Sequence, residues 1–331
     1  MRFVVWLTAV LFVAYSGYWV VGSRAARSGA EAALVELRGA GRADFASVTI
    51  AGFPSRFDLT ISEPRLTDRA SGLAWSAPFL QVLALSYRPN QMVVVWPDDQ
   101  TLTVGSATVG LTTEDLRASV TVGASTALPL DRLTLVGQAP RAAWAGGSVA
   151  ADELRFATAR VPAAPGAPAN AHRLGLAVTG LRLPGDRLPA ALQAVPAAIS
   201  LDAVAAFAAP VDRTALDGLP PLTRLSLAAA TIAWGAVTGR ATGEVSVTPA
   251  GRPEGRIDVT IAGWRTALEA AEAFRLIRPE IAPTVGNVLE TLSRGTPNPD
   301  EIRIPVDFRS GLVFLGPLPL GPAPVLPGYR Q

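Results

Sequence analysis

Polar and apolar residues alternate in short segments through most of this 331-residue chain. In one such segment Phe57, Leu59 and Ile61 fall on one face, while Asp58 and Thr60 fall on the other. A period of two is typical of half-buried antiparallel strands. The same alternation recurs at residues 102–104, 120–122, 133–135, 225–227, 245–247 and 257–261. Stretches rich in Gly, Pro, Asn and Asp separate these segments, which predicts a β-rich body built mostly from hairpins.

Helical patterns are few. An Ala-rich stretch at 24–43 predicts a helical stalk, and a second helix is predicted over 264–294 with interruptions at Pro279 and Pro283. The apolar residues at 281, 285, 288, 289 and 292 lie on one face of that second helix. We therefore expect a mainly β fold with a few helices. Its antiparallel, hairpin-built curved sheets would form an elongated sandwich or an open trough.

The chain begins with an uncharged run, the 21 residues from Phe3 to Ser23. At a rise of ~1.5 Å per residue, a helix of this length can just cross a hydrocarbon core of ~30 Å. Arg2 precedes the run and Arg24 follows it, as is typical of a transmembrane helix. The aromatic residues expected at the level of the lipid headgroups are Trp6, Tyr15, Tyr18 and Trp19.

A cleaved signal peptide is the alternative interpretation of this run. The apolar core of a signal peptide usually spans about 7 to 15 residues and ends at a small-x-small site. Here the run is longer and closes with residues 19–23, Trp-Val-Val-Gly-Ser, which favours an uncleaved anchor. The orientation is ambiguous, because Arg24, Arg27 and Arg38 after the helix favour a cytoplasmic body by the positive-inside rule. Long domains, however, cross the membrane largely regardless of flanking charge.

The composition excludes several chemistries. The chain has no Cys and no Lys, so it has no thiol nucleophile, disulfide, Walker A lysine or Schiff-base amine. The formal net charge is only +2, and the arginines form no block suited to a nucleic-acid backbone. We therefore expect no nucleic-acid partner.

No catalytic, cofactor or metal site is predicted. The single histidine, His172, follows a Pro-Ala-Gly-rich segment and is expected to be a solvated loop residue. No Gly-x-Ser-x-Gly motif supplies a nucleophile, and no Asp-x-Asp-x-Asp-Gly loop supplies a calcium site. Adjacent carboxylates are interpreted as solvated turns or strand ends rather than as catalytic pairs; they lie at 98–99, 114–115, 152–153 and 300–301.

The chain is expected to have five parts. These are an anchor at 1–23, a stalk at 24–43, a β-rich half at 44–160, a Pro/Ala/Gly linker at 161–171, and a second β-rich half at 172–331. Residues 52–61 and 251–261 share a pattern of Gly-x-Pro, Arg and apolar-Asp-apolar-Thr-Ile, with one inserted residue. The match indicates either a repeated strand-rich unit or chance convergence of two turns.

Three motifs resemble a known family. They are Gly52-Phe53-Pro54-Ser55-Arg56-Phe57-Asp58-Leu59, Trp75-Ser76-Ala77-Pro78, and the segment from Asp307 to Pro319. Together they resemble the alphaproteobacterial envelope proteins classed as domain of unknown function 2125, and more distantly the AsmA-like superfamily. The resemblance implies an inner-membrane, single-pass protein with its body in the periplasm, and by analogy a role in lipid handling.

Two functions fit these observations. The first is a membrane-anchored, non-enzymatic envelope protein that binds or helps to transfer a lipid or another apolar ligand in a β-lined groove. The second is a structural or assembly protein of the envelope without a small-molecule ligand. The membrane is the expected partner, lipid is a possible second one, and no protein partner follows from the sequence. The apolar groove is predicted on the two matching strands, at Phe57, Leu59, Ile61, Ile257, Val259 and Ile261.

Overall fold

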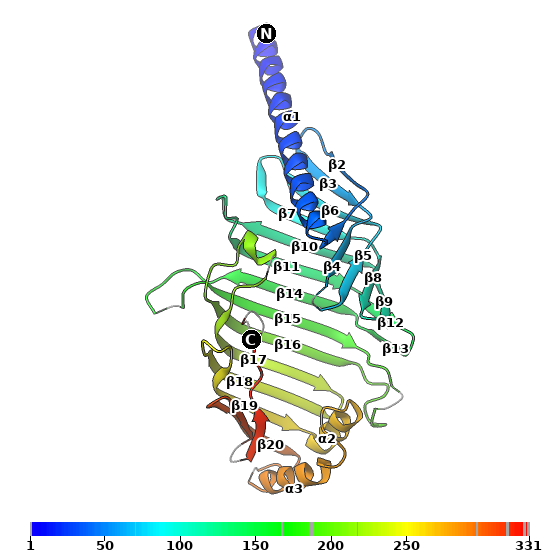
Figure 1. The fold of residues 1–331 in the computed structure, drawn as a ribbon, viewed down its shortest axis with the longest axis vertical. Helices are drawn as coiled ribbons and strands as arrows, with labels where there is room; N and C mark the ends of the chain where they lie inside the picture. Colours follow the sequence, from blue (N-terminus) through cyan, green and yellow to red (C-terminus); the bar gives the residue numbers. More distant parts are fainter. Residues whose placement is uncertain are drawn as a thin grey trace. The chain divides into compact units, whose positions relative to one another are not determined.

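The computed structural model describes residues 2–69, 71–166, 168–185, 188–216, 218–295, 297–315, 318–326 and 329 (Figure 1). Ala167 of the expected linker, and Gly316 and Pro317 of the C-terminal motif, lie outside these residues. A long N-terminal helix precedes antiparallel open sheets, which confirms the mainly β fold class. The chain divides into two units, one formed by residues 1–124 and 134–147 and the other by 125–133 and 148–331.

Unit 1 contains the N-terminal helix and a meander of strands. The helix is α1 (Arg2–Gly39), and it runs without a break from the expected anchor into the expected stalk. The strands are β1 (Ala43–Asp44), β2 (Ser47–Ala51), β3 (Arg56–Ser62), β4 (Arg65–Asp68), β5 (Leu73–Ser76), β6 (Phe79–Leu85), β7 (Arg88–Trp96), β8 (Asp99–Val104), β9 (Ala107–Thr112), β10 (Asp115–Val122) and β12 (Arg141–Trp144). Two further strands, β11 (Leu130–Gln138) and β13 (Gly147–Ala150), contribute residues to both units.

Prolines lie at four of the steps where the unit 1 meander passes from one sheet to the other, whereas the β1–β2 and β9–β10 steps have none. One sheet has the order β2-β3-β6-β7-β10 in this unit, and the other runs β1-β4-β5-β8-β9-β12. A proline has no N–H to donate to a strand ladder, so it favours the ends of a strand. The prolines at these steps are Pro64 between β3 and β4, Pro78 between β5 and β6, Pro97 between β7 and β8, and Pro140 between β11 and β12.

Helix α1 packs on the apolar face of β3. Phe57 at the start of β3 is buried, with its ring 6.1 Å from the Trp19 ring. At Gly22 a Cβ atom would lie 2.8 Å from Cζ of Phe57, so only glycine lets the helix approach this ring so closely. The first of the two predicted groove strips is therefore partly covered by the chain's own helix.

Three of the four aromatic residues expected at the lipid headgroups contact turns of unit 1, whereas Trp6 is exposed. The Tyr15 hydroxyl lies 2.9 Å from Oγ of Ser86, and the Tyr18 hydroxyl donates to the Ser86 carbonyl at 2.6 Å. The Trp19 indole N–H donates to the Arg56 carbonyl at 2.7 Å. The sequence signal was the same for either location, because an amphipathic aromatic side chain suits both a headgroup and a polar protein turn.

Unit 2 is a broad antiparallel sheet with two helices at one end. Its strands are β14 (Glu153–Arg160), β15 (Ala171–Leu181), β16 (Ala197–Phe207), β17 (Leu222–Trp234), β18 (Val237–Val247), β19 (Pro253–Ala262), β20 (Glu301–Arg309), β21 (Leu312–Leu315) and β22 (Leu318–Pro322), each paired with the next. A short 3-10 turn spans Arg213–Leu216. The helix predicted over 264–294 is two helices, α2 (Trp264–Ala273) and α3 (Ala282–Ser293).

The structure divides the chain at positions other than the expected linker. Strands β14 and β15 pair from Glu153↔Thr179 to Arg160↔His172, so the segment 161–170 is the connection of a hairpin inside unit 2. Proline and glycine favour tight turns as much as interdomain linkers, so composition alone does not distinguish the two.

The contact between α1 and β3 gives the first testable prediction. Replacing Phe57 with alanine removes a buried ring, and we expect the free energy of unfolding of the full chain in detergent to fall by about 3–5 kcal/mol. The matched control is Asp58→Ala, because Asp58 lies on the opposite face and pairs with Arg56 at 2.7 Å on the surface. The free energy of unfolding should fall much less in this control. Equal decreases in the two variants, measured by chemical denaturation, would contradict the face assigned to Phe57.

Candidate apolar binding cavity

The strand register of unit 2 gathers apolar side chains on one face of the sheet. One row across five strands is Val178, Ile199, Ile232, Gly239 and Ile261. A second row, two residues further along each strand, is Leu176, Leu201, Ala230, Ala241 and Val259. These side chains are half-buried rather than buried, so this face is a concave apolar surface that keeps access to solvent.

The opposite face of the same strands is charged and polar. Arg173 of β15 pairs with Asp202 of β16 at 2.7 Å, and Arg256 of β19 pairs with Asp307 of β20 at 2.7 Å. Hydrogen bonding to these guanidinium groups lowers the pKa of Asp202 and the pKa of Asp307. Alternation along each strand thus separates a solvated ionic face from an apolar one.

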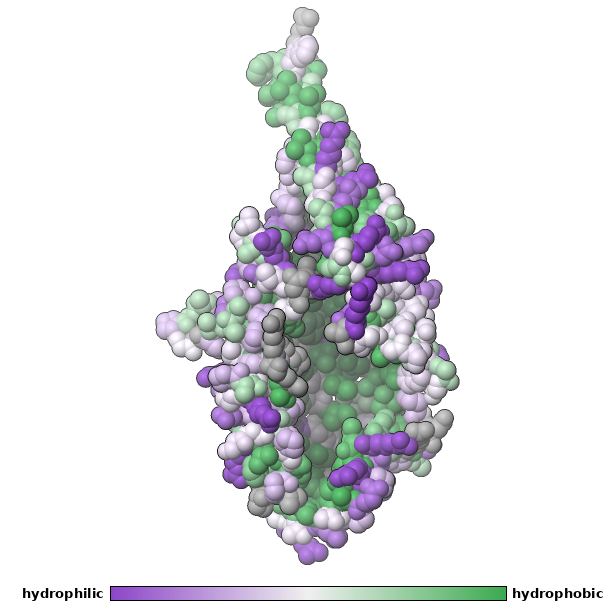
Figure 2. All heavy atoms as spheres, viewed as in Figure 1, coloured by the Kyte–Doolittle hydropathy of each residue, from purple (hydrophilic) through white to green (hydrophobic). Residues whose placement is uncertain are grey.

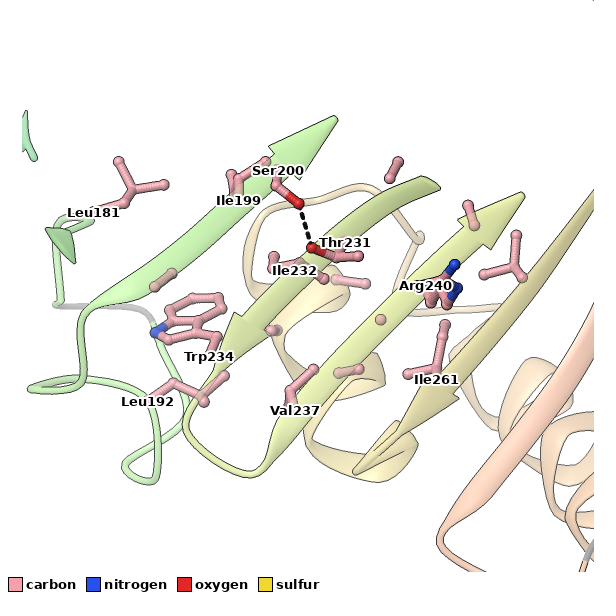
Figure 3. Close-up of a pocket in the computed structure, with 18 of the residues that line it drawn as sticks. Leu181, Leu192, Ile199, Ser200, Thr231, Ile232, Trp234, Val237, Arg240 and Ile261 are labelled. Atoms are coloured by element: carbon pink, nitrogen blue, oxygen red, sulfur yellow. Dashed lines mark hydrogen bonds between the residues drawn. The ribbon is translucent and has the colours of Figure 1, made fainter. Parts of the chain in front are cut away.

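One end of the apolar face is closed by a small core. Trp234 at the end of β17 is buried and packs in a cluster with Leu188, Leu192 and Val237. Its indole N–H donates to the Val195 carbonyl at 2.8 Å, which fixes the plane of the ring. Figure 3 shows Trp234, Leu192 and Val237 close together at this end of the cavity.

Helix α2 forms the wall next to that core. It begins directly after Gly263, which has φ of +68°, and a Cβ there would lie 2.6 Å from the Ala236 carbonyl oxygen. The Trp264 indole donates to the Pro299 carbonyl at 3.2 Å, and its ring packs in a second cluster with Leu289, Ile302 and Ile304. The Phe274 ring, just after α2, lies 6.3 Å from the Trp234 ring.

The space enclosed by these elements is a cavity of about 650 Å³. Figure 2 shows hydrophobic residues lining a hollow over the sheet of unit 2, with hydrophilic residues along its rim. The lining residues are Leu176, Leu181, Leu183, Leu192, Ala197, Ile199, Ser200, Leu201, Ala230, Thr231, Ile232, Trp234, Val237, Gly239, Arg240, Ala241, Val259, Ile261, Ala267, Ala270, Ala271, Phe274 and Leu276. Cavities of this volume and chemistry are typical of sites for small apolar ligands.

Small residues set the depth of the cavity floor. Gly239 lies beside Ile232, and a Cβ at Gly239 would lie only 2.8 Å from Cγ2 of that isoleucine. Ala230 and Ala241 face each other across β17 and β18, in the row that continues to Val259. Larger side chains at these positions would fill the space that the cavity occupies.

Polar groups are scarce in the lining. Arg240, Ser200 and Thr231 share one row of the sheet, and this row alternates with the two apolar rows. Their side chains therefore fall on the ionic face, and only their backbone borders the cavity. The Ser200 and Thr231 hydroxyls lie 2.7 Å apart and bond to each other (Figure 3). The side chains that point into the cavity from the sheet are therefore apolar.

The six residues of the predicted groove have different surroundings. Val259 and Ile261 line the cavity, whereas Ile257 lies further along β19 and outside the lining. In unit 1, Phe57 and Ile61 are buried and Leu59 is half-buried. Most of the cavity, including α2 and the Trp234 core, comes from segments that sequence reasoning did not select. The signal that was available is the alternation of β16 to β18, which has the same period as β19.

The histidine prediction was wrong. His172 is buried in β15, with Nδ1 at 3.3 Å from Oγ1 of Thr158 and its ring 6.2 Å from the Phe207 ring. Burial lowers the pKa of His172, and the nearby Arg160 charge lowers it further. The histidine starts a long strand, so its side chain packs inward although the sequence before it has the composition of a loop.

The adjacent carboxylates lie at strand ends, as expected. Asp115 begins β10 and contacts Arg117 at 2.6 Å, and Glu153 begins β14 and contacts Arg155 at 2.8 Å. Asp152 contacts Arg182 at 2.8 Å. Within the part of the chain that the structure describes, no group of three or more His, Asp or Glu side chains is arranged to hold a metal ion.

A comparison with protein-family models gives one match. The model of an uncharacterised protein family conserved in bacteria, domain of unknown function 2125, covers residues 19–324. The chain belongs to this family. The match begins at Trp19, so it includes Trp19 and Gly22 of the docked part of α1 but not Tyr15 or Tyr18. No curated protein and no solved structure matches the chain, so the more distant AsmA-like resemblance gains no support from these comparisons.

The buried histidine predicts a pH dependence of stability. A histidine whose pKa is lowered by folding is neutral in the folded state, so its contribution is fully present above the unfolded pKa of about 6.5 and is lost as the pH falls. We expect the free energy of unfolding to decline between pH 7 and pH 5, by up to about 1.4 kcal/mol per pH unit for one proton. The carboxyl groups whose pKa is lowered in the folded chain change the free energy of unfolding only at more acidic pH.

The control for this prediction is His172→Gln, which keeps a polar partner for Thr158 but cannot titrate. Its stability at pH 7 and at pH 5, measured by denaturant unfolding, should differ much less than that of the parent chain. An equal pH dependence in the two proteins would contradict the assignment to His172.

Proposed function

We propose that this chain is a membrane-anchored, non-enzymatic envelope protein that binds or helps to transfer a lipid or another apolar ligand in the cavity of unit 2. The observation that carries the proposal is the cavity itself. It is apolar, has a volume of about 650 Å³, and is lined by half-buried side chains of β15 to β19. A soluble domain normally buries such a face against a second layer of structure.

The chemistry of the lining favours an acyl chain. Each buried methylene contributes about 0.8 kcal/mol, so roughly ten methylenes contribute about 8 kcal/mol before the entropic costs of binding. The two inward-facing rows across β15 to β19 carry no side-chain hydrogen-bond donor for a polar ligand. The exposed apolar side chains of Phe274 and Leu276 border the cavity, where they would contact the rest of a long ligand.

A catalytic role has little support in the surroundings of the cavity. His172 is buried beside Thr158 and is absent from the cavity lining. Carboxylates are also absent from the lining among the described residues, and a hydrolase needs an acid, a base or a nucleophile within hydrogen-bond reach of its substrate. A ligand carrier needs none of these groups.

The anchor and its docking favour an uncleaved single-pass protein of the inner membrane with its body in the periplasm. Helix α1 is long and apolar enough to cross a membrane. Cleavage after Ser23 would remove Tyr15, Tyr18 and Trp19, and with them the hydrogen bonds that join the helix to Ser86 and Arg56. The proposed compartment rests on the resemblance to envelope proteins and on the weak effect of flanking charge on long domains.

The topology is tested with a reporter enzyme whose disulfides form only outside the cytoplasm, fused after Gln331. We expect the reporter to be active, the fusion to remain with membranes after a salt wash, and N-terminal sequencing to find the run intact. An inactive reporter, together with a fluorescent cytoplasmic one in the same position, would contradict the periplasmic placement.

The binding function is tested by mass spectrometry of lipids that co-purify with the full chain. The test variant is Ala241→Arg, which places a charge on the apolar face, and the matched control is Thr242→Arg, one residue along β18 on the opposite face beside Asp258. We expect Ala241→Arg to lose the bound lipid while keeping a near-parental melting temperature, because the cavity leaves room for the side chain. Thr242→Arg should keep both.

A structural or assembly role is the alternative function, and the same experiment distinguishes it. If the apolar face is a closed core in solution, the charge introduced by Ala241→Arg has no water and no partner, and stability should fall by several kcal/mol. Unfolding of Ala241→Arg, together with a parent chain that carries no lipid, would favour the structural role.

A further inference from the structure

Unit 1 has an apolar tip beside α1. Two turns form this tip: the β2–β3 turn around Phe53 and the β6–β7 turn at Ser86 and Tyr87. Both lie against the second half of the apolar run of α1. The Phe12 ring lies edge-on to the Phe53 ring at 6.4 Å, and the Trp19 ring does so at 5.3 Å.

The length of the anchor places these turns at the depth of lipid. The part of the run before the contact, residues 3–11, is about 13 Å long at ~1.5 Å per residue. A hydrocarbon core is ~30 Å thick, so this part alone spans less than half of it. The remaining part, residues 12–23, carries the tip along its side. If the whole run lies in the membrane, the tip enters the membrane with it.

The surface of the tip suits that environment. Phe53 is 49% exposed, Tyr87 is 61% exposed and Leu85 is 38% exposed, although each is a large apolar or aromatic side chain. Ser86, between two of them, is fully buried and bonded to α1. The Ser86 carbonyl accepts from Tyr18 of the helix and the Ser86 N–H donates to the Ser55 carbonyl, while the side chains of Leu85 and Tyr87 are exposed.

Arginines stand directly behind both turns. Arg56 is the first residue of β3 and Arg88 is the first residue of β7, and both are exposed, with Arg56 paired to Asp58 at 2.7 Å. Long arginine side chains beside an inserted apolar surface reach back to the phosphate level of the lipid headgroups. The order of apolar tip and then arginine is thus the same on the two turns.

We propose that Phe53, Tyr87 and Leu85 insert into the membrane leaflet nearest the body, alongside the C-terminal half of the anchor, with Arg88 at the lipid phosphates. The occupant of this surface is the lipid bilayer, because the surface is continuous with the apolar helix. Unit 1 is then held at the membrane by three chain segments rather than by a helix alone. This inference rests on the membrane anchoring in the proposed function and is independent of ligand binding in the cavity.

The absence of cysteine from the chain allows a direct test. Single substitutions Tyr87→Cys and Phe53→Cys are made in the full chain, labelled with an environment-sensitive fluorophore, and reconstituted in phosphatidylethanolamine–phosphatidylglycerol vesicles. Tyr87→Cys is the primary probe, since Phe53 also packs on α1. The control is Ser106→Cys, an exposed turn residue between β8 and β9, reached from Tyr87 only after the full lengths of β7 and β8.

We expect the labels at 87 and 53 to shift to shorter emission wavelengths and to be quenched by lipids that carry a spin label. Quenching should be strongest from labels high on the acyl chain, because interfacial insertion is roughly 5–10 Å deep. The label at 106 should show aqueous emission and no quenching by these lipids.

The other outcomes overturn the proposal in distinguishable ways. If the chain sediments with vesicles but all three labels remain aqueous, the tip does not insert, while the anchoring stands. A shift to shorter wavelengths without quenching means that protein, such as a second copy of the chain, covers the tip. If the chain does not sediment with vesicles, both this inference and the proposed anchoring fail. Loss of lipid from the cavity in any of these variants has no bearing on the result.

Discussion

The backbone hydrogen bonds between β15 and β20 hold each strand in one register, and the cavity depends on this register. They bring Ile199, Ile232 and Ile261 into one row and Leu201, Ala230 and Val259 into the next. A slip of one residue in any strand would turn its arginines and aspartates into the apolar face. The ion pairs on the other face, such as Arg173 with Asp202, fit the same register and disfavour such a slip.

The apolar face of the unit 2 sheet is incompletely buried at the cavity. At one end, Trp234 and Trp264 each belong to a closed cluster in which the indole N–H has a carbonyl partner. Between these clusters and the middle of the sheet, the apolar side chains remain half-buried. Half-buried aliphatic side chains lose part of the ~25 cal/mol per Å² that full burial would contribute. A ligand that covers them supplies this missing burial, which is why the cavity is the physical basis of the proposed function.

In unit 1 the corresponding apolar strip is covered by a helix of the chain itself. The β3 strip packs against α1, with Phe57 buried under Trp19 and Gly22. The helix that is long enough to cross a membrane is thus also part of the packing of unit 1. The N-terminal run is therefore a structural element of unit 1 as well as the proposed anchor, and its packing places the tip around Phe53 and Tyr87 beside the apolar helix.

The sequence by itself determined the local structure. Alternation specified the strands, the uncharged run specified α1, and prolines and glycines marked the turns, because these signals act over a few residues. The tertiary structure alone decided what covers each apolar face. Phe57 and Val259 have the same pattern around them, yet one lies under a helix and the other lines a cavity. His172 was misjudged for the same reason, since its burial depends on Thr158 and Phe207, which reach it only through strand pairing and packing. Alternation indicates that one face of a strand is apolar. Only the long-range pairing and packing of the strands determine what covers that face.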